Sequence, residues 1–182
     1  MLLTLIRHLP TEWNKKTWLQ GRRDIDLAPV NGEFAVKIEQ NKELLRKQQF
    51  DLVLASTLRR THQTARLYGY QPETEGLLDE LDFGPFEGEP KQRLIEMYGP
   101  QWIENPKALV LGESLMNLES RITHFLKKYK DHQNVLIFGH GSWIRGLVSY
   151  VDYGHINNMN KIIVENNQCI TLEVEIGDEM EG

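Results

Sequence analysis

The sequence has a single cysteine, Cys169, among its 182 residues. An internal disulfide and a cysteine-rich metal cluster are therefore excluded. Cys169 precedes the alternating apolar segment 170–176, and free cysteine is among the most buried residue types. We therefore expect a small buried hydrophobe rather than a reactive thiol. A chain without disulfides is typical of a reducing compartment, so we expect the protein in the cytoplasm.

Long apolar runs and an excess of positive charge are also missing. No apolar run approaches the ~20 residues of a membrane-spanning helix, and the first residues lack the basic start of a secretion signal. Lys and Arg number 21 against 26 Asp and Glu, which gives a net charge of −5. We therefore expect no membrane partner and no nucleic-acid partner. A phosphorylated substrate stays compatible, because the local charge of a site can oppose the net charge.

Several signatures of cofactor binding and hydrolysis are absent. There is no Gly-x-x-x-x-Gly-Lys loop, and Gly139-x-Gly141 lacks the third glycine of the dinucleotide fingerprint. Ser142 does not lie in the Gly-x-Ser-x-Gly turn of serine hydrolases. Four further histidines are scattered along the chain rather than spaced as metal ligands: His62, His124, His132 and His155. We expect no cofactor and no metal.

Two apolar runs each lead into a histidine. Residues 2–6 precede His8, and residues 135–138 precede His140. Short runs rich in Leu, Ile and Val predict buried parallel strands, and ligands of open α/β sheets bind outside the carboxyl ends of the strands. One such histidine alone would more often cap a strand or face water. Two of them at equivalent positions favour one shared site.

Strands and helices alternate along the chain, which predicts an α/β protein. Further strands are expected at 51–55, and at 162–164 and 170–176 as a terminal hairpin. Helices are expected at 32–48, after Ser56 as its N-cap, from Ser114 and from near Ser142. The length, with 40% hydrophobic and 26% charged residues, predicts one domain over 1–182.

Residues 84–112 are rich in glycine and proline, with only a short helical pattern near 92–98. This composition predicts a compact, lid-like excursion over the site rather than a second domain.

Five blocks of sequence, in order, resemble the histidine phosphatase superfamily, also called phosphoglycerate mutase-like. Residues 7–14 read RHLPTEWN, similar to the family pattern Arg-His-Gly-x-Thr-x-x-Asn, and 19–22 read LQGR. Residues 56–65 read STLRRTHQTA and resemble Ser-x-x-x-Arg-Ala-x-Gln-Thr-Ala. The remaining matches are LDELDFGPFEG at 78–88, GES at 112–114 and HG at 140–141. The resemblance implies a single-domain, three-layer α/β/α sandwich with a mostly parallel central sheet.

The resemblance also implies roles for particular residues. His8 would be the nucleophile that takes the phosphoryl group, Glu80 the proton donor, and His140 the second catalytic histidine. Arg7 and Arg60 would bind the phosphate, because a guanidinium offers paired donors to phosphate oxygens. Four further positions would contact the substrate: Asn14, Gln20, Gly21 and Gly141.

From the residues alone, some of these assignments have alternatives. Glu80 stands among Asp79, Asp82 and Glu87, any of which could be the donor. Arg60 follows Arg59, and either arginine could point into water.

Two positions depart from the family pattern. Leu9 stands where the family has glycine, and Thr61 stands where it has alanine. Leucine cannot make every backbone approach that glycine allows. We expect the Leu9 side chain to point away from the phosphate and to pack against apolar neighbours.

These observations favour a metal-independent phosphomonoesterase that hydrolyses a small phosphorylated metabolite through a phosphohistidine. One alternative is a phosphoglycerate mutase, although such enzymes carry a longer insertion than residues 81–139 provide. The other is a non-catalytic phosphate-binding regulator, for which Leu9 is the only hint. Small relatives that share the Asp-Phe-Gly-x-x-Glu-Gly run include α-ribazole-5′-phosphate phosphatases, which makes that ester a candidate substrate.

Overall fold

A computed structural model of the chain describes residues 1–177. Five strands form one sheet in the order β3-β2-β4-β1-β5. Their bounds are β1 Leu2–Arg7, β2 Leu52–Ala55, β3 Glu73–Thr74, β4 Asn134–Gly139 and β5 Cys169–Glu173. All pairings are parallel except that of β5, which runs antiparallel to β1.

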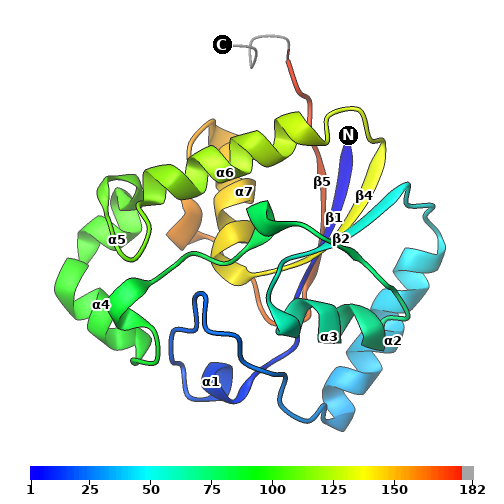
Figure 1. Cartoon of the computed structure of the whole chain (residues 1–182), viewed down its shortest axis with the longest axis horizontal. Coiled ribbons are helices and arrows are strands. Elements are labelled where there is room, and N and C mark those ends of the chain that lie inside the picture. Colours follow the sequence, from blue (N-terminus) through cyan, green and yellow to red (C-terminus); the bar gives the residue numbers. More distant parts are fainter. Residues whose placement is uncertain (178–182) are drawn as a thin grey trace.

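The sheet has a hydrophobic core on each face. Leu3 and Leu5 of β1 join the core on one face, whereas Ile6 joins the other. This division follows from the alternation of side chains along a strand. The helices are α1 Glu12–Lys15, α2 Gly32–Arg46, α3 Arg59–Leu67, α4 Lys91–Tyr98, α5 Pro100–Glu104, α6 Leu115–Lys128 and α7 Gly141–Tyr153. Figure 1 shows α6 and α7 on one side of the strands and α2 on the other, which confirms the α/β/α sandwich.

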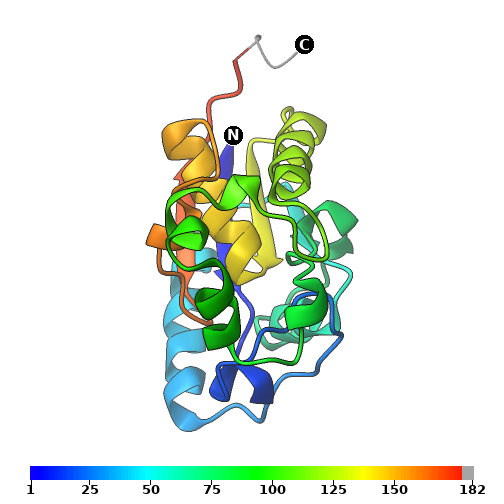
Figure 2. The same cartoon turned by 90° about the vertical axis from the view of Figure 1, so that its left-hand side faces the viewer.

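The glycine- and proline-rich excursion holds two short helices, α4 and α5, of which sequence periodicity indicated only the first. Pro100 begins α5, as a proline can at the first position of a helix. In Figure 2 this green segment lies in front of α7. Trp102 of α5 is almost fully buried and belongs to the larger core.

The predicted terminal hairpin is wrong. Residues 162–164 form no strand, and β5 pairs with β1 instead. The physical reason lies at the end of β1, where Arg7 Nη1 donates to Val164 O at 2.6 Å and Asn167 N donates to Arg7 O at 2.9 Å. Residues 164–167 therefore make hydrogen bonds to the end of β1 instead of forming a strand. Cys169, at the start of β5, is half-buried and packs against the smaller core.

The predicted N-cap of α3 is also wrong. The cap residue is Leu58, without a side-chain hydrogen bond, and Ser56 lies before it. The Ser56 hydroxyl accepts from Leu58 N and lies within hydrogen-bond distance of His140 Nε2. It therefore contacts the residue that follows β4 and does not cap α3.

Candidate active site

The two histidines that end apolar runs meet at one edge of the sheet. Arg7 of β1 lies opposite Gly139 of β4 in the parallel register, and His8 N donates to Gly139 O at 3.0 Å. The rings of His8 and His140 are 5.4 Å apart between centroids and tilted by 62°. The site therefore lies at the carboxyl ends of adjacent parallel strands.

His8 is held as a neutral imidazole with one nitrogen open. Its Nδ1 lies 2.7 Å from Leu9 O, and a carbonyl can only accept, so Nδ1 carries the ring proton. Nε2 then keeps its lone pair, and the residue lines a cleft of about 270 Å³. Burial lowers the pKa of His8 well below its ordinary value, and the charges of Arg60 and Arg7 lower it further. The unprotonated form is the one that can act as a nucleophile.

His140 is completely buried behind the cleft. Its Nε2 lies 2.7 Å from Ser56 Oγ, which in turn lies 3.0 Å from Thr61 Oγ1. Burial, followed by the charge of Arg60, lowers the pKa of His140 well below its ordinary value. Its Nδ1 has no partner within residues 1–177. Thr61, where the family has alanine, thus adds a hydroxyl to the hydrogen bonds behind this histidine.

Two arginines, the buried Arg60 and the partly buried Arg7, line the cleft with His8 and have no carboxylate partner in the described part of the chain. Arg60 lies in the first turn of α3 and donates to Arg23 O and Gly21 O at 2.6 and 2.7 Å. The Nε atoms of Arg7 and Arg60 are buried and unpaired within residues 1–177. Burial lowers the pKa of each to about 10, so both remain cationic at neutral pH. Arg59, by contrast, points outward and pairs with Asp24.

Glu80 reaches the cleft from the segment that follows β3. Its Oε2 accepts from Ser142 N at 3.0 Å, and its Oε1 accepts from Trp143 N at 3.1 Å and from Leu81 N at 2.8 Å. Ser142 N and Trp143 N belong to the first turn of α7, where the helix dipole favours negative charge. The carboxylate is therefore fixed at the N-terminus of α7, close in sequence to His140.

The other predicted contact residues also line this cleft. Asn14 Oδ1 accepts from Thr11 N at 3.0 Å, which leaves the amide NH₂ as the group free to donate to a ligand. Gln20 Oε1 lies 2.7 Å from Thr11 Oγ1. Gly21 has a φ of +52°, and its carbonyl accepts from Arg60. A Cβ there would lie 2.1 Å from Glu87 Oε1, so glycine is required for both reasons.

Leu9 does not enter the cleft. Its side chain is completely buried in the smaller core with Ile38 and Leu136. Its N–H donates to Thr64 Oγ1 at 3.0 Å, and its backbone does not have a positive φ. The expected packing of Leu9 is confirmed, and nothing at this position requires glycine.

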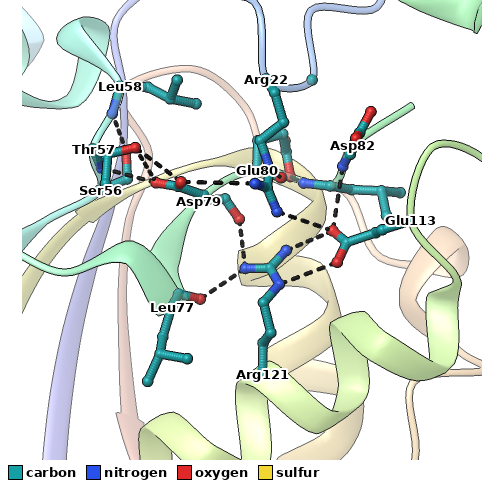
Figure 3. A network of polar contacts seen from close by, with 12 residues as sticks. Arg22, Ser56, Thr57, Leu58, Leu77, Asp79, Glu80, Asp82, Glu113 and Arg121 are labelled. Carbon is teal, nitrogen blue, oxygen red and sulfur yellow. Dashed lines mark hydrogen bonds and ion pairs between the residues drawn. The ribbon is translucent and has the colours of Figure 1, made fainter. Parts of the chain in front are cut away.

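An ionic network holds the backbone on both sides of Glu80 (Figure 3). Arg121 of α6 donates to Leu77 O and Asp79 O at 2.8 and 2.9 Å, and its Nη2 lies 2.7 Å from Glu113 Oε1. Burial alone would raise the pKa of Glu113, but the hydrogen bonds and charge of Arg121 lower it. Arg22 Nε donates to Glu80 O at 2.6 Å. The predicted Gly-Glu-Ser block, residues 112–114, thus supports the backbone around Glu80, because Glu113 binds Arg121.

Several residues that line the cleft were not singled out from the sequence, among them Lys91, Ser142, Arg145 and Asn166. Arg145 had a sequence signal, because it lies four residues after Gly141 and so shares one face of a helix with it. Lys91 and Asn166 belong to segments whose position depends on the tertiary fold.

Two further observations concern the described residues as a set. Within residues 1–177 no three His, Cys, Asp or Glu side chains are grouped so that they could hold a metal ion. Across the same residues, no helix combines the length and apolar character needed to span a membrane.

Known proteins are similar to this chain in sequence and in architecture. The profile described as histidine phosphatase superfamily (branch 1) matches residues 3–180. The chain is 30% identical to "Putative phosphoserine phosphatase 2" of Hydrogenobacter thermophilus, across 95% of this chain and 89% of that protein. It is also 30% identical to a 2,3-bisphosphoglycerate-dependent phosphoglycerate mutase of Cytophaga hutchinsonii, across 83% and 77%. The solved alpha-ribazole phosphatase of Shigella flexneri matches with a TM-score of 0.76 at 24% identity, across 96% and 91%.

Proposed function

Because this chain belongs to the histidine phosphatase superfamily and is a phosphatase, we propose that it hydrolyses small phosphate monoesters, without a metal ion, through a phosphohistidine on His8. The proposal rests chiefly on one observation. A neutral imidazole with its Nε2 open shares one cleft with two guanidinium groups that have no carboxylate partner within the described residues.

The first half of the reaction is phosphoryl transfer to the enzyme. His8 Nε2 attacks phosphorus while the bond from phosphorus to the ester oxygen breaks, and Glu80 gives its proton to the departing oxygen. Arg7 and Arg60 bind the phosphate oxygens, and Asn14 and His140 donate to them. In such a site, fixed donors stabilise the charge of the transferring group.

The second half returns the enzyme to its starting state. Glu80, now ionised, takes a proton from water, and the oxygen of that water attacks the phosphohistidine. The bond from phosphorus to Nε2 breaks, and inorganic phosphate leaves. One carboxyl group serves both halves, and Glu80 lines the same cleft as His8.

Trapping the intermediate tests this proposal. Wild-type protein quenched during turnover of a ³²P-labelled phosphate monoester should carry acid-labile, base-stable label, and His8→Ala should carry none. Label that persists in His8→Ala would contradict the assignment. Turnover should be the same with and without chelator, and a strict requirement for added metal would overturn the metal-free reaction.

The same assay separates a phosphatase from a mutase. A phosphatase releases inorganic phosphate in step with loss of the ester, whereas a mutase fed 3-phosphoglycerate and 2,3-bisphosphoglycerate would form 2-phosphoglycerate instead. We expect release of phosphate. α-Ribazole-5′-phosphate belongs in the substrate panel, and absence of turnover of any ester would leave the phosphate-binding regulator as the function.

A further inference from the structure

The cleft holds more positive charge than a phosphate group requires. Four basic side chains line it, namely Arg7, Arg60, Lys91 and Arg145, against the single carboxylate of Glu80. Among the described residues, none of these four cations has a carboxylate oxygen within ion-pair distance. A phosphate dianion would balance two of them.

Arg145 is placed by neutral groups rather than by an acid. Its Nη2 donates to Ser142 Oγ at 3.1 Å and lies 3.3 Å from Asn160 Oδ1. A Cβ added to Gly141 would lie 3.1 Å from Arg7 Cζ and 3.2 Å from Arg145 Nη1, so both guanidinium groups approach the same glycine. Two like charges held together in this way are stabilised by an anion that contacts one of them from the cleft.

Lys91 adds to this excess of positive charge from a different segment of the chain. It begins α4, within the glycine- and proline-rich excursion, and lines the same cleft. Burial lowers the pKa of Lys91, and the charges of Arg145 and Arg7 lower it further. The positive charges of Arg145 and Arg7 therefore repel that of Lys91 within the cleft.

The cleft continues past these residues. A second cavity of about 390 Å³ shares five wall residues with it: Arg7, Lys91, Trp102, Arg145 and Asn166. Its other walls are mostly apolar, with Ile95 and Ile162 among them, and Glu165 is the acidic side chain that lines it. Arg7, Arg145 and Lys91 therefore lie at the junction, whereas His8 and Arg60 line the first cavity and not the second.

We propose that Arg145 and Lys91 form a second anion site, and that the substrate carries a second anionic group, a carboxylate or another phosphate, close to its phosphate ester. This inference rests on the proposed function, because it places the phosphate itself at His8, Arg7 and Arg60. It disfavours α-ribazole-5′-phosphate, whose single phosphate would leave Arg145 and Lys91 without an anion.

Matched pairs of esters test the proposal. O-phosphoserine differs from O-phosphoethanolamine by one carboxylate, and fructose 1,6-bisphosphate differs from fructose 6-phosphate by one phosphate. We expect kcat/KM to be at least about tenfold higher for the doubly anionic member of one pair or of both, since a hydrogen bond between charged groups is worth that factor or more. The pair with the larger ratio identifies the group.

Charge-removing variants then assign the preference to these residues. Arg145→Gln and Lys91→Gln should each lower the ratio within the preferred pair, mainly through a higher KM for the doubly anionic ester. Arg145→Lys should restore part of the ratio. The exposed residues Arg66 and Lys47 provide matched controls outside the cleft, and Arg66→Gln and Lys47→Gln should keep the wild-type ratio.

The outcomes separate the two proposals. Ratios near one in the wild type, or an equal loss on both members of a pair in Arg145→Gln, would overturn the second anion site. Phosphohistidine label would still form in that case. If no label forms on His8, the proposed function itself fails, whatever the ratios.

Discussion

The Glu80 carboxylate is held by three backbone N–H groups, two of them at the start of α7. Its proposed task as proton donor matters less when the departing oxygen is already stable as an anion. Glu80→Gln should therefore lose more activity on an alkyl phosphate than on p-nitrophenyl phosphate, by about 10²-fold or more on the former. Steady-state kinetics on both esters measures this difference. Equal losses would indicate a structural role, or Asp82 or Glu87 as donor.

Leu9 offers a second prediction for a single residue. Because its side chain is completely buried in the smaller core, Leu9→Ala should lower the free energy of unfolding by about 2–5 kcal/mol. It should keep most of the activity, since the side chain does not line the cleft. Urea unfolding and kcat/KM on one ester give the two values. A large gain in activity with unchanged stability would contradict this assignment.

At this scale the sequence predicted the residues whose chemistry is carried by a short motif. His8 was identifiable because it follows a predicted strand, and Glu80 and Arg60 because their surroundings resemble family motifs. Arg145 and Lys91 were not, because their role comes from the absence of a partner. Only folded coordinates show that, within residues 1–177, neither side chain has a carboxylate oxygen within ion-pair distance.

The connection between α6 and the segment bearing Glu80 depends on one buried ion pair. The side chains of Arg121 and Glu113 are 12% and 10% exposed, and without Arg121 the remaining cation near Glu113 among residues 1–177 is Arg22, whose Nη2 lies 3.5 Å from Glu113 Oε1. Arg121→Met should cost about 3–5 kcal/mol of unfolding free energy, and Arg121→Met with Glu113→Leu should recover part of it. The exposed Lys161 pair with Glu104 is the control, and Lys161→Met should change stability by less than about 1 kcal/mol.

A kinetic measurement on Arg121→Met separates positioning from stability alone. Arg121 binds the carbonyls of Leu77 and Asp79, so its loss should displace Glu80. We expect the ratio of alkyl phosphate to p-nitrophenyl phosphate turnover to fall, at a temperature where the variant is fully folded. An unchanged ratio would show that the pair only stabilises the fold.

Among the elements, long periodic segments were predictable and short ones were not. The apolar spacing of α6 and the unbroken run of β4 are strong local signals. β3 has two residues, and its pairing with Leu54 and Ala55 of β2 is a tertiary contact that no local pattern contains. The wrong hairpin has the same origin, since β5 finds its partner in β1, far away in sequence.

Across the whole molecule, the two buried histidines make stability depend on pH. Folding lowers the pKa of His8 and His140 well below 6.5, so below that pH the unfolded chain binds protons that the folded protein does not. Stability is therefore fully present above about pH 6.5 and falls as the pH drops. Each histidine should lower the free energy of unfolding by up to about 1.4 kcal/mol for each pH unit below that value.

Urea unfolding at pH 7.5, 6.5 and 5.5 measures this loss. The double variant His8→Gln with His140→Gln should flatten the profile between pH 6.5 and 5.5. Carboxylates with lowered pKa values, such as Glu113, titrate below this window and do not confound it. A wild-type profile that is flat down to pH 5.5 would contradict the buried neutral state of both rings.

The contacts at the end of β1 have a consequence for how the protein is made. Arg7 and His8 are synthesised well before their partners Val164, Asn166 and Asn167, which lie far along the chain. At ~5–20 residues per second, the gap of roughly 160 residues is on the order of 10–30 s. A nascent chain that has not yet reached residues 164–167 therefore lacks a finished phosphate site, and the catalyst becomes competent only after this segment has been added.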